Sequence, residues 1–263
     1  MKHALAFLCL SATLLTGSVV GAVEPAQINC PNAEQFTKLG TTLPTTAAAL
    51  RRGDELVVVA IGSSSTSGVG ASDRTHSYPA RLESELQHYW PGRRVRVINK
   101  GIGGEEAPQM IARFERDVLS HNPDLVIWQA GTNMMLRNEN KDTLLPQLRA
   151  GVRTLKDNHI DVVLMDPQYA PKVTDVPSHP EFVAAIATIA DEQRVGLFHR
   201  FTLMRSWVEA KAFAVDDIIS PDKLHMNDVS YTCIARGLAA GIADAVRATP
   251  VPMAIQHGAT STR

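Results

Sequence analysis

A regular alternation between short apolar runs and longer stretches with helical spacing constrains the fold most strongly, and it begins near residue 54. The first run, ELVVVAI, is continuous, as is typical of a strand buried on both faces. Four further runs follow: VRVIN, DLVIWQA, DVVLMD and GLFH. This pattern predicts an α/β fold with a mostly parallel five-stranded sheet and helices on both faces.

Between the apolar runs, apolar residues recur every three or four positions, as in amphipathic helices. The segments with this spacing are 77–90, 105–119, 144–155, 182–189 and 227–246. In the second of them Met110, Phe114 and Val118 share one face, so we expect a single continuous helix there.

The alternating region predicts one domain over residues 54–248. Residues 23–53 are rich in Thr, Ala and Pro, and we expect them to form an extended lead-in. Residues 249–263 hold two prolines followed by a polar stretch, which predicts a flexible tail.

The N-terminus has the pattern of a secretory signal peptide. A short positive segment, MKH, precedes an apolar stretch, and small residues suited to cleavage follow it. We therefore predict that residues 1–22 are removed and that the protein is exported, to a periplasm or outside the cell. The alternative is a membrane anchor that stays attached, and the small and hydroxyl residues in the stretch weigh against it.

Two cysteines remain beyond the predicted signal, Cys30 and Cys233. An oxidising compartment permits a disulfide between them, and two unpaired buried thiols are the alternative. The sequence alone leaves both readings open.

Composition excludes several classes of partner. The formal net charge of −1 gives no basic surface for nucleic acid or for an anionic membrane. Aromatic residues make up 5% of the chain, which argues against a stacking platform for single strands. Neither C-x-x-C nor H-E-x-x-H occurs, so we expect no metal site and no cofactor.

Three predicted strands end in polar or glycine-rich clusters. The first runs into GSSST (62–66), the second into NKGIGG (99–104) and the third into GTN (131–133). Because parallel strands share one carboxyl edge, and ligands bind outside that edge, we expect these clusters to converge. Loops favour the same residue types, so any one cluster alone is weak.

A fourth cluster, PDKLHMND, places Asp222 and His225 three residues apart just before the last helix. A carboxylate there can accept the Nδ1–H of the imidazole, and the imidazole can then activate a serine. Glycine N–H groups and the amide of Asn133 are suitable donors for an oxyanion. The combination predicts acyl transfer at a nucleophilic serine.

In order and spacing, the four clusters resemble the four blocks of the SGNH hydrolases, also called the GDSL esterase/lipase family, over residues 55–246. The resemblance implies a three-layer α/β/α sandwich that is flavodoxin-like. It places the nucleophile on Ser64, the base on His225 and the acid on Asp222. The oxyanion donors would be the N–H groups of Ser64 and Gly104 and the side chain of Asn133.

Three points in the assignment stay open or depart from the family pattern. Gly101 and Gly103 are alternatives to Gly104 as the oxyanion glycine. Ser63 replaces the usual Asp before the nucleophile, and Met134 replaces the Asp that often follows the Asn. Neither departure removes a catalytic group, so we expect activity to survive.

The resemblance implies an exported serine esterase that hydrolyses short-chain O-acyl esters, with a small-molecule or carbohydrate ester as its substrate. The alternatives are a lysophospholipase or thioesterase of the same family, or an inactive carbohydrate-binding module on this scaffold. The loop after the fourth strand offers Gln168 and Tyr169 as candidates for substrate contact, and ordinary loop packing is the alternative. Oligomeric state and the natural ester are not determined by the sequence.

Overall fold

All five predicted strands form one sheet in the computed structural model, which describes residues 28–31 and 34–251. The strand order is β2-β1-β3-β4-β5, and every neighbouring pair is parallel. The strands are β1 (Leu56–Gly62), β2 (Val95–Gly101), β3 (Leu125–Gln129), β4 (Asp161–Met165) and β5 (Gly196–Phe198). This confirms the predicted α/β class with its flavodoxin-like order, and the sheet is wholly rather than mostly parallel.

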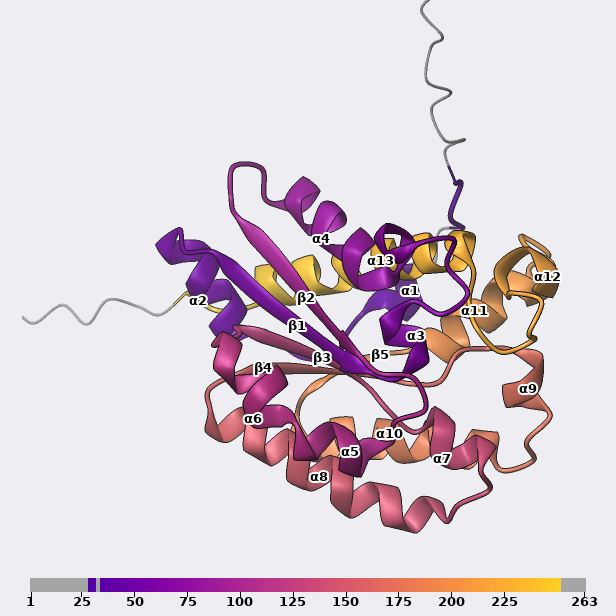
Figure 1. Cartoon of the computed structure of the whole chain (residues 1–263). Helices are drawn as coiled ribbons and strands as arrows, with labels where there is room; N and C mark the ends of the chain where they lie inside the picture. The colour runs from indigo at the N-terminus through magenta and orange to yellow at the C-terminus, as the bar shows by residue number, and fades with distance from the viewer. Residues whose placement is uncertain (1–27, 32–33, 252–263) are drawn as a thin grey trace, which may run out of the picture.

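Helices cover both faces of the sheet, which gives three layers (Figure 1). Helices α4 (Tyr78–Tyr89) and α13 (Asp228–Arg247) pack together on one face. Helices α8 (Lys141–Asp157) and α10 (His179–Gln193) pack together on the other. Because both faces are covered, every residue of β1, β3 and β4 is buried, and the continuous apolar runs follow from that burial.

Shorter helices complete the fold. They are α1 (Glu34–Thr37), α2 (Pro44–Arg52), α3 (Ser64–Ser67), η1 (Arg74–His76), α5 (Ala107–Ala112), α6 (Phe114–Asp117), η2 (Leu119–His121), α7 (Thr132–Leu136), α9 (Pro171–Thr174), α11 (Arg200–Glu209) and α12 (Val215–Ile218). No helix in the described ranges is both long enough and apolar enough to cross a membrane.

The single helix predicted over residues 105–119 is wrong, because the chain forms α5, α6 and η2 instead. The break falls at Arg113, whose backbone leaves the helical region. Its buried guanidinium donates to the carbonyl oxygens of Lys100 (2.8 Å) and Gly62 (3.4 Å). These bonds hold Arg113 against the ends of two strands, and apolar periodicity contains no signal for them.

The extended lead-in predicted over residues 23–53 is also wrong for residues 44–52, which form α2. Proline suits the first turn of this helix, and a glycine in the left-handed region ends it. Thr46 on its buried face donates its N–H and its hydroxyl to Oδ2 of Asp161, both at 2.8 Å. These two bonds fix α2 to the start of β4.

The chain ends are tied to the domain at two points. Cys30 and Cys233 form a disulfide that links the N-terminal segment to α13, 203 residues away in sequence, so the pairing left open by the sequence is present. Such a crosslink typically stabilises a fold by roughly 2 to 5 kcal/mol. Thr249, the first residue of the predicted tail, is buried and accepts the N–H of Leu43 at 3.1 Å. The predicted signal peptide and residues 252–263 lie outside the described residues.

Candidate active site

Three of the polar clusters meet at the carboxyl ends of β1, β2 and β3, as predicted. Oε1 of Gln129, the last residue of β3, accepts the N–H (2.9 Å) and the hydroxyl (3.0 Å) of Ser63 at the end of β1. Gly101 ends β2 directly against α3, and a Cβ atom there would lie 2.0 Å from the backbone nitrogen of Ser67. Only glycine allows this close approach. Gln129 is a site residue that the sequence analysis missed.

The fourth cluster comes to the same edge and completes a line of three side chains. Nε2 of His225 lies 2.7 Å from Oγ of Ser64, although 161 residues separate them. Nδ1 of the same ring lies 2.5 Å from Oδ2 of Asp222. The His225 side chain is 13% exposed, so water has limited access to the ring. This arrangement can support nucleophilic catalysis, in which a serine attacks, a histidine takes its proton and a carboxylate orients the histidine.

We call residues 220–226 the acid–base turn. The Asp222 carboxylate holds this turn in shape by accepting hydrogen bonds from within it. Its Oδ1 accepts the N–H groups of Leu224 and His225, both at 2.9 Å, and the hydroxyl of Ser220 at 2.8 Å. Lys223 adopts the left-handed conformation, with φ of 63°, which closes the turn.

Burial raises the pKa of Asp222, but hydrogen bonds from the His225 ring, the His225 and Leu224 N–H groups and the Ser220 hydroxyl lower it by more, so the net pKa is below its usual range. The carboxylate therefore remains charged beside the imidazole at neutral pH.

The predicted oxyanion donors each keep a hydrogen that is not bonded to another protein group in the described part of the chain. The N–H groups of Ser64 and Gly104 have no protein acceptor among the described residues. Nδ2 of Asn133 donates to the carbonyl oxygen of Glu105 at 2.8 Å, which fixes the amide and leaves its second hydrogen. The donor set is therefore available for an oxyanion, as an oxyanion hole requires.

The structure narrows the choice of the glycine whose N–H group is predicted to bind the oxyanion. The N–H of Gly101 donates to Oδ1 of Asn99 at 2.9 Å, so this group is already used. Gly104 has φ of 78°, which favours glycine, whereas Gly103 lies with its would-be Cβ 3.9 Å from Cβ of Ser64. Gly104 and Gly103 both remain candidates.

Arg137 holds the glycine loop by its guanidinium group, and no sequence pattern pointed to this residue. Nη2 of Arg137 donates to the carbonyl oxygen of Gly104 at 2.8 Å, and Nη1 pairs with Glu106. Because Arg137 directly follows α7, which carries Asn133, it links the two segments that carry predicted oxyanion donors.

The loop after β4 does not present Gln168 to a substrate. Gln168 is 1% exposed, and both ends of its amide are bonded to protein groups. Tyr169 is half-buried, with its ring edge-on to Phe201 at a centroid distance of 5.4 Å. Loop packing is therefore the better interpretation of Gln168.

The two departures from the family pattern, Ser63 and Met134, are both buried and contribute to packing.

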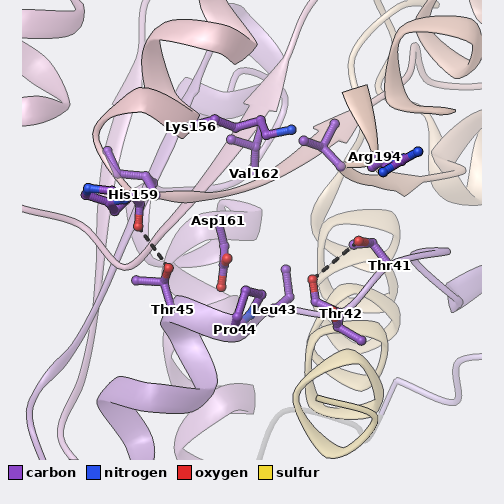
Figure 2. A pocket seen from close by; sticks show the side chains of 12 residues that line it. Thr41, Thr42, Leu43, Pro44, Thr45, Lys156, His159, Asp161, Val162 and Arg194 are labelled. Carbon is purple, nitrogen blue, oxygen red and sulfur yellow. Dashed lines mark hydrogen bonds between the residues drawn. The ribbon is translucent and has the colours of Figure 1, made fainter. Parts of the chain in front are cut away.

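A separate pocket of about 270 Å³ lies at the opposite, amino edge of the sheet (Figure 2). It is lined by residues just before and at the start of α2, at the end of α8 and around the starts of β4 and β5, including Thr45, Lys156, His159, Asp161 and Arg194. It contains no serine. In the described part of the chain, no three His, Cys, Asp or Glu residues are placed to hold a metal ion.

Comparison with known proteins identifies the family. The sequence profile of the Non-GDSL lipase-like family matches residues 29–248. The chain belongs to this family. The match begins before residue 54 and so takes in α2, and it confirms the resemblance to SGNH/GDSL-type esterases.

Relatives of this Non-GDSL lipase-like chain are esterases. An arylesterase of Vibrio mimicus is 27% identical over 149 residues, which cover 55% of this chain and 70% of the relative. An acetylxylan esterase of Geobacillus stearothermophilus is 32% identical over 102 residues, which cover 35% of this chain and 47% of that enzyme.

Solved structures share the fold. An acetyl-xylooligosaccharide esterase from Geobacillus superposes with a TM-score of 0.61 and 22% identity, covering 71% of this chain and 94% of that one. A two-domain esterase active on acetylated mannans gives 0.67 and 20% identity, covering 83% of this chain and 59% of that one. Identities this low establish the architecture alone.

Proposed function

We propose that this protein is an exported serine esterase that removes short acyl groups, such as acetyl, from carbohydrate esters. The observation that carries the proposal is the continuous hydrogen-bonded line from Asp222 through His225 to Ser64, with distances of 2.5 and 2.7 Å. A line of this kind activates a hydroxyl for acyl transfer.

In the proposed reaction, Ser64 Oγ attacks the ester carbonyl while Nε2 of His225 takes its proton. The tetrahedral intermediate collapses, the C–O bond to the alcohol breaks, and His225 returns the proton to that alcohol. Water then attacks the acyl-enzyme with the same histidine as base, which releases the acid and restores Ser64. Asp222 holds the Nδ1–H tautomer and stabilises the imidazolium.

The negative charge on the carbonyl oxygen needs fixed donors, and three are proposed. They are the N–H groups of Ser64 and Gly104 and the amide of Asn133, which the Glu105 carbonyl holds in place. Preorganised donors of this kind are worth about 3 kcal/mol each to the transition state.

The proposed substrate class rests on the relatives. Structurally similar enzymes act on acetylated xylo-oligosaccharides and on acetylated mannans. The export part of the proposal is supported by the signal-like N-terminus and by the Cys30–Cys233 disulfide, since such bonds persist in oxidising compartments.

The first test is hydrolysis of p-nitrophenyl acetate, butyrate and octanoate, and release of acetate from acetylated xylo- and manno-oligosaccharides. The protein without residues 1–22 is compared with its Ser64→Ala variant, and Ser67→Ala, one helical turn away, is the matched control. We expect turnover that falls from acetate to octanoate, is lost in Ser64→Ala and is retained in Ser67→Ala.

Three other outcomes would contradict parts of this proposal. A preference for octanoate would support the lysophospholipase or thioesterase alternative. Equal activity of the protein and of Ser64→Ala would show that Ser64 is not the nucleophile. No turnover of any ester, together with calorimetric binding of the same oligosaccharides, would support the binding-module alternative.

A further inference from the structure

A buried chain of hydrogen bonds connects the start of α11 to the acid–base turn. Arg200, the first residue of α11, is 0% exposed. Its Nε donates to the carbonyl oxygen of Asp166 at 2.9 Å, and its Nη2 donates to Oε1 of Gln168 at 3.1 Å. Nε2 of Gln168 in turn donates to the carbonyl oxygen of Leu224 at 3.1 Å. The start of α11 is thus connected to the middle of the acid–base turn.

The carbonyl that Gln168 holds belongs to the peptide unit between Leu224 and His225. That unit is planar, so its C=O and its N–H move together. Gln168 binds the oxygen end, and Oδ1 of Asp222 accepts the N–H end at 2.9 Å. Fixing both ends sets the orientation of this peptide unit, and with it the place from which the His225 side chain leaves the backbone.

Further contacts make the support rigid. Oδ1 of Asp166 accepts the N–H of Phe201 at 2.8 Å, which anchors the loop after β4 to the first turn of α11. The N–H of Lys172, in α9 directly after this loop, donates to the carbonyl oxygen of Lys223 at 3.0 Å. The acid–base turn therefore rests on residues 166–172 through two hydrogen bonds, and only one of them comes from a side chain.

Stability alone does not explain this chain of bonds. Burial lowers the pKa of Arg200 and raises the pKa of Asp166 to about 7, so the charged forms of both are disfavoured here. Buried ionic groups can often be replaced by apolar residues of similar volume without loss of stability. What an apolar residue cannot supply is a donor aimed at the Leu224 carbonyl.

We propose that Gln168, oriented by Arg200, is a positioning residue that keeps His225 within hydrogen-bond reach of Ser64. The inference rests on the proposed esterase function. A displacement of about 1 Å at a reacting group can cost on the order of a hundredfold in rate, so a modest tilt of the peptide unit has a large consequence.

Two variants test the role. Gln168→Met keeps the volume and loses both hydrogen bonds, and Gln168→Glu keeps an acceptor for Arg200 but, when ionised, has no hydrogen for the Leu224 carbonyl. We expect both to lower kcat for p-nitrophenyl acetate by roughly 10- to 100-fold, with KM within about twofold. Rates are divided by the concentration of sites titrated with a phosphonate, so that unfolded protein does not count.

A second readout does not depend on ester hydrolysis. The Nδ1–H proton shared by His225 and Asp222 is expected to give a low-field proton NMR signal, which should broaden or move in both variants. Thr46→Val is the matched control, since it removes a buried hydrogen bond to Asp161 at the other edge of the sheet. It should lower Tm while kcat and the NMR signal stay unchanged.

The proposal is overturned if kcat per titrated site stays within twofold and the signal stays in place, whether or not Tm falls. If Gln168→Met does not fold, Gln168→Glu decides the matter by the same two readouts. If the unmutated protein hydrolyses no ester, the proposed function fails by itself, and the NMR comparison still decides whether Gln168 positions His225.

Discussion

Asp222 at the carboxyl edge of the sheet and Asp161 at the amino edge accept similar hydrogen bonds. Each carboxylate takes one hydroxyl and one or more backbone N–H groups from neighbouring residues. Their pKa values nevertheless move in opposite directions. Burial raises the pKa of Asp161 by more than its bonds to Thr46 and Thr45 lower it, whereas the bonds to Asp222, including that from the His225 ring, outweigh burial.

The two edges also differ in what their polar groups are bonded to. Around the amino-edge pocket, Thr45 donates to the His159 carbonyl (Figure 2), and Lys156 donates to the carbonyl oxygen of Gln193 at 2.7 Å. These hydrogen bonds join separate segments of the chain to one another. At the carboxyl edge, Ser64 Oγ is hydrogen-bonded to Nε2 of His225, and the N–H groups of Ser64 and Gly104 have no protein acceptor among the described residues. A hollow thus indicates a catalytic site only when reactive groups are aimed into it.

The largest expected effect is a loss of activity that occurs when Asp222 is replaced but not when Asp161 is replaced. Asp222→Asn should lower kcat/KM for p-nitrophenyl acetate by about 10³- to 10⁴-fold, because an amide favours the wrong tautomer of His225. Asp161→Asn, the matched change at the amino edge, should leave it within about threefold. A comparable loss in Asp161→Asn would show that the amino edge of the sheet also contributes to activity.

The next effect in size compares two asparagines whose Nδ2–H groups each donate to a backbone carbonyl oxygen. Asn133→Ala should lower kcat by roughly 10²- to 10³-fold through loss of an oxyanion donor. Asn158 donates to the carbonyl oxygen of Thr154 at 2.9 Å at the amino edge, and Asn158→Ala should leave kcat unchanged. Steady-state kinetics with Tm measured in parallel checks both, and an unchanged rate in Asn133→Ala would remove it from the mechanism.

A smaller effect is the pH dependence of stability. The lowered pKa of Asp222 contributes stability that is present above its unfolded pKa of about 3.9 and is lost as pH falls through the lowered value. The raised pKa of Asp161 has the opposite sign, so ionising this group costs stability as pH rises.

Thermal unfolding from pH 3 to pH 7 measures both signs. Relative to the unmutated protein, the Tm of Asp222→Asn should become lower as pH rises, and that of Asp161→Asn should become higher. Parallel slopes for the two variants would contradict the assignment of opposite pKa shifts.

The smallest effect tests whether the amino-edge pocket takes part in the reaction. Lys156→Ala removes a cation from the rim of this pocket, where its ammonium group donates to the backbone carbonyl of Gln193. We expect kcat and KM for p-nitrophenyl acetate to stay within twofold. A larger change would show that the two edges are coupled.

Sequence periodicity was sufficient for the sheet, because continuous apolar runs are required of strands covered on both faces. It failed at residues 105–119, where Arg113 leaves the helix to bond two strand ends. It also failed at α2, where a Thr/Ala/Pro composition gave no clear amphipathic pattern. In both places, a bond to a residue distant in sequence decided the local conformation.

For the site, the sequence was sufficient to predict the chemical groups, since the four blocks carry a serine, a glycine loop, an asparagine and an Asp-x-x-His. The rule that parallel strands share a carboxyl edge was sufficient to predict that the first three blocks meet. That Gln129 joins β1 to β3 and that Gln168 bonds the acid–base turn is visible only in the folded chain. The physical reason is that hydrogen bonds depend on direction and on ångström-scale distance, which are settled when distant segments pack together.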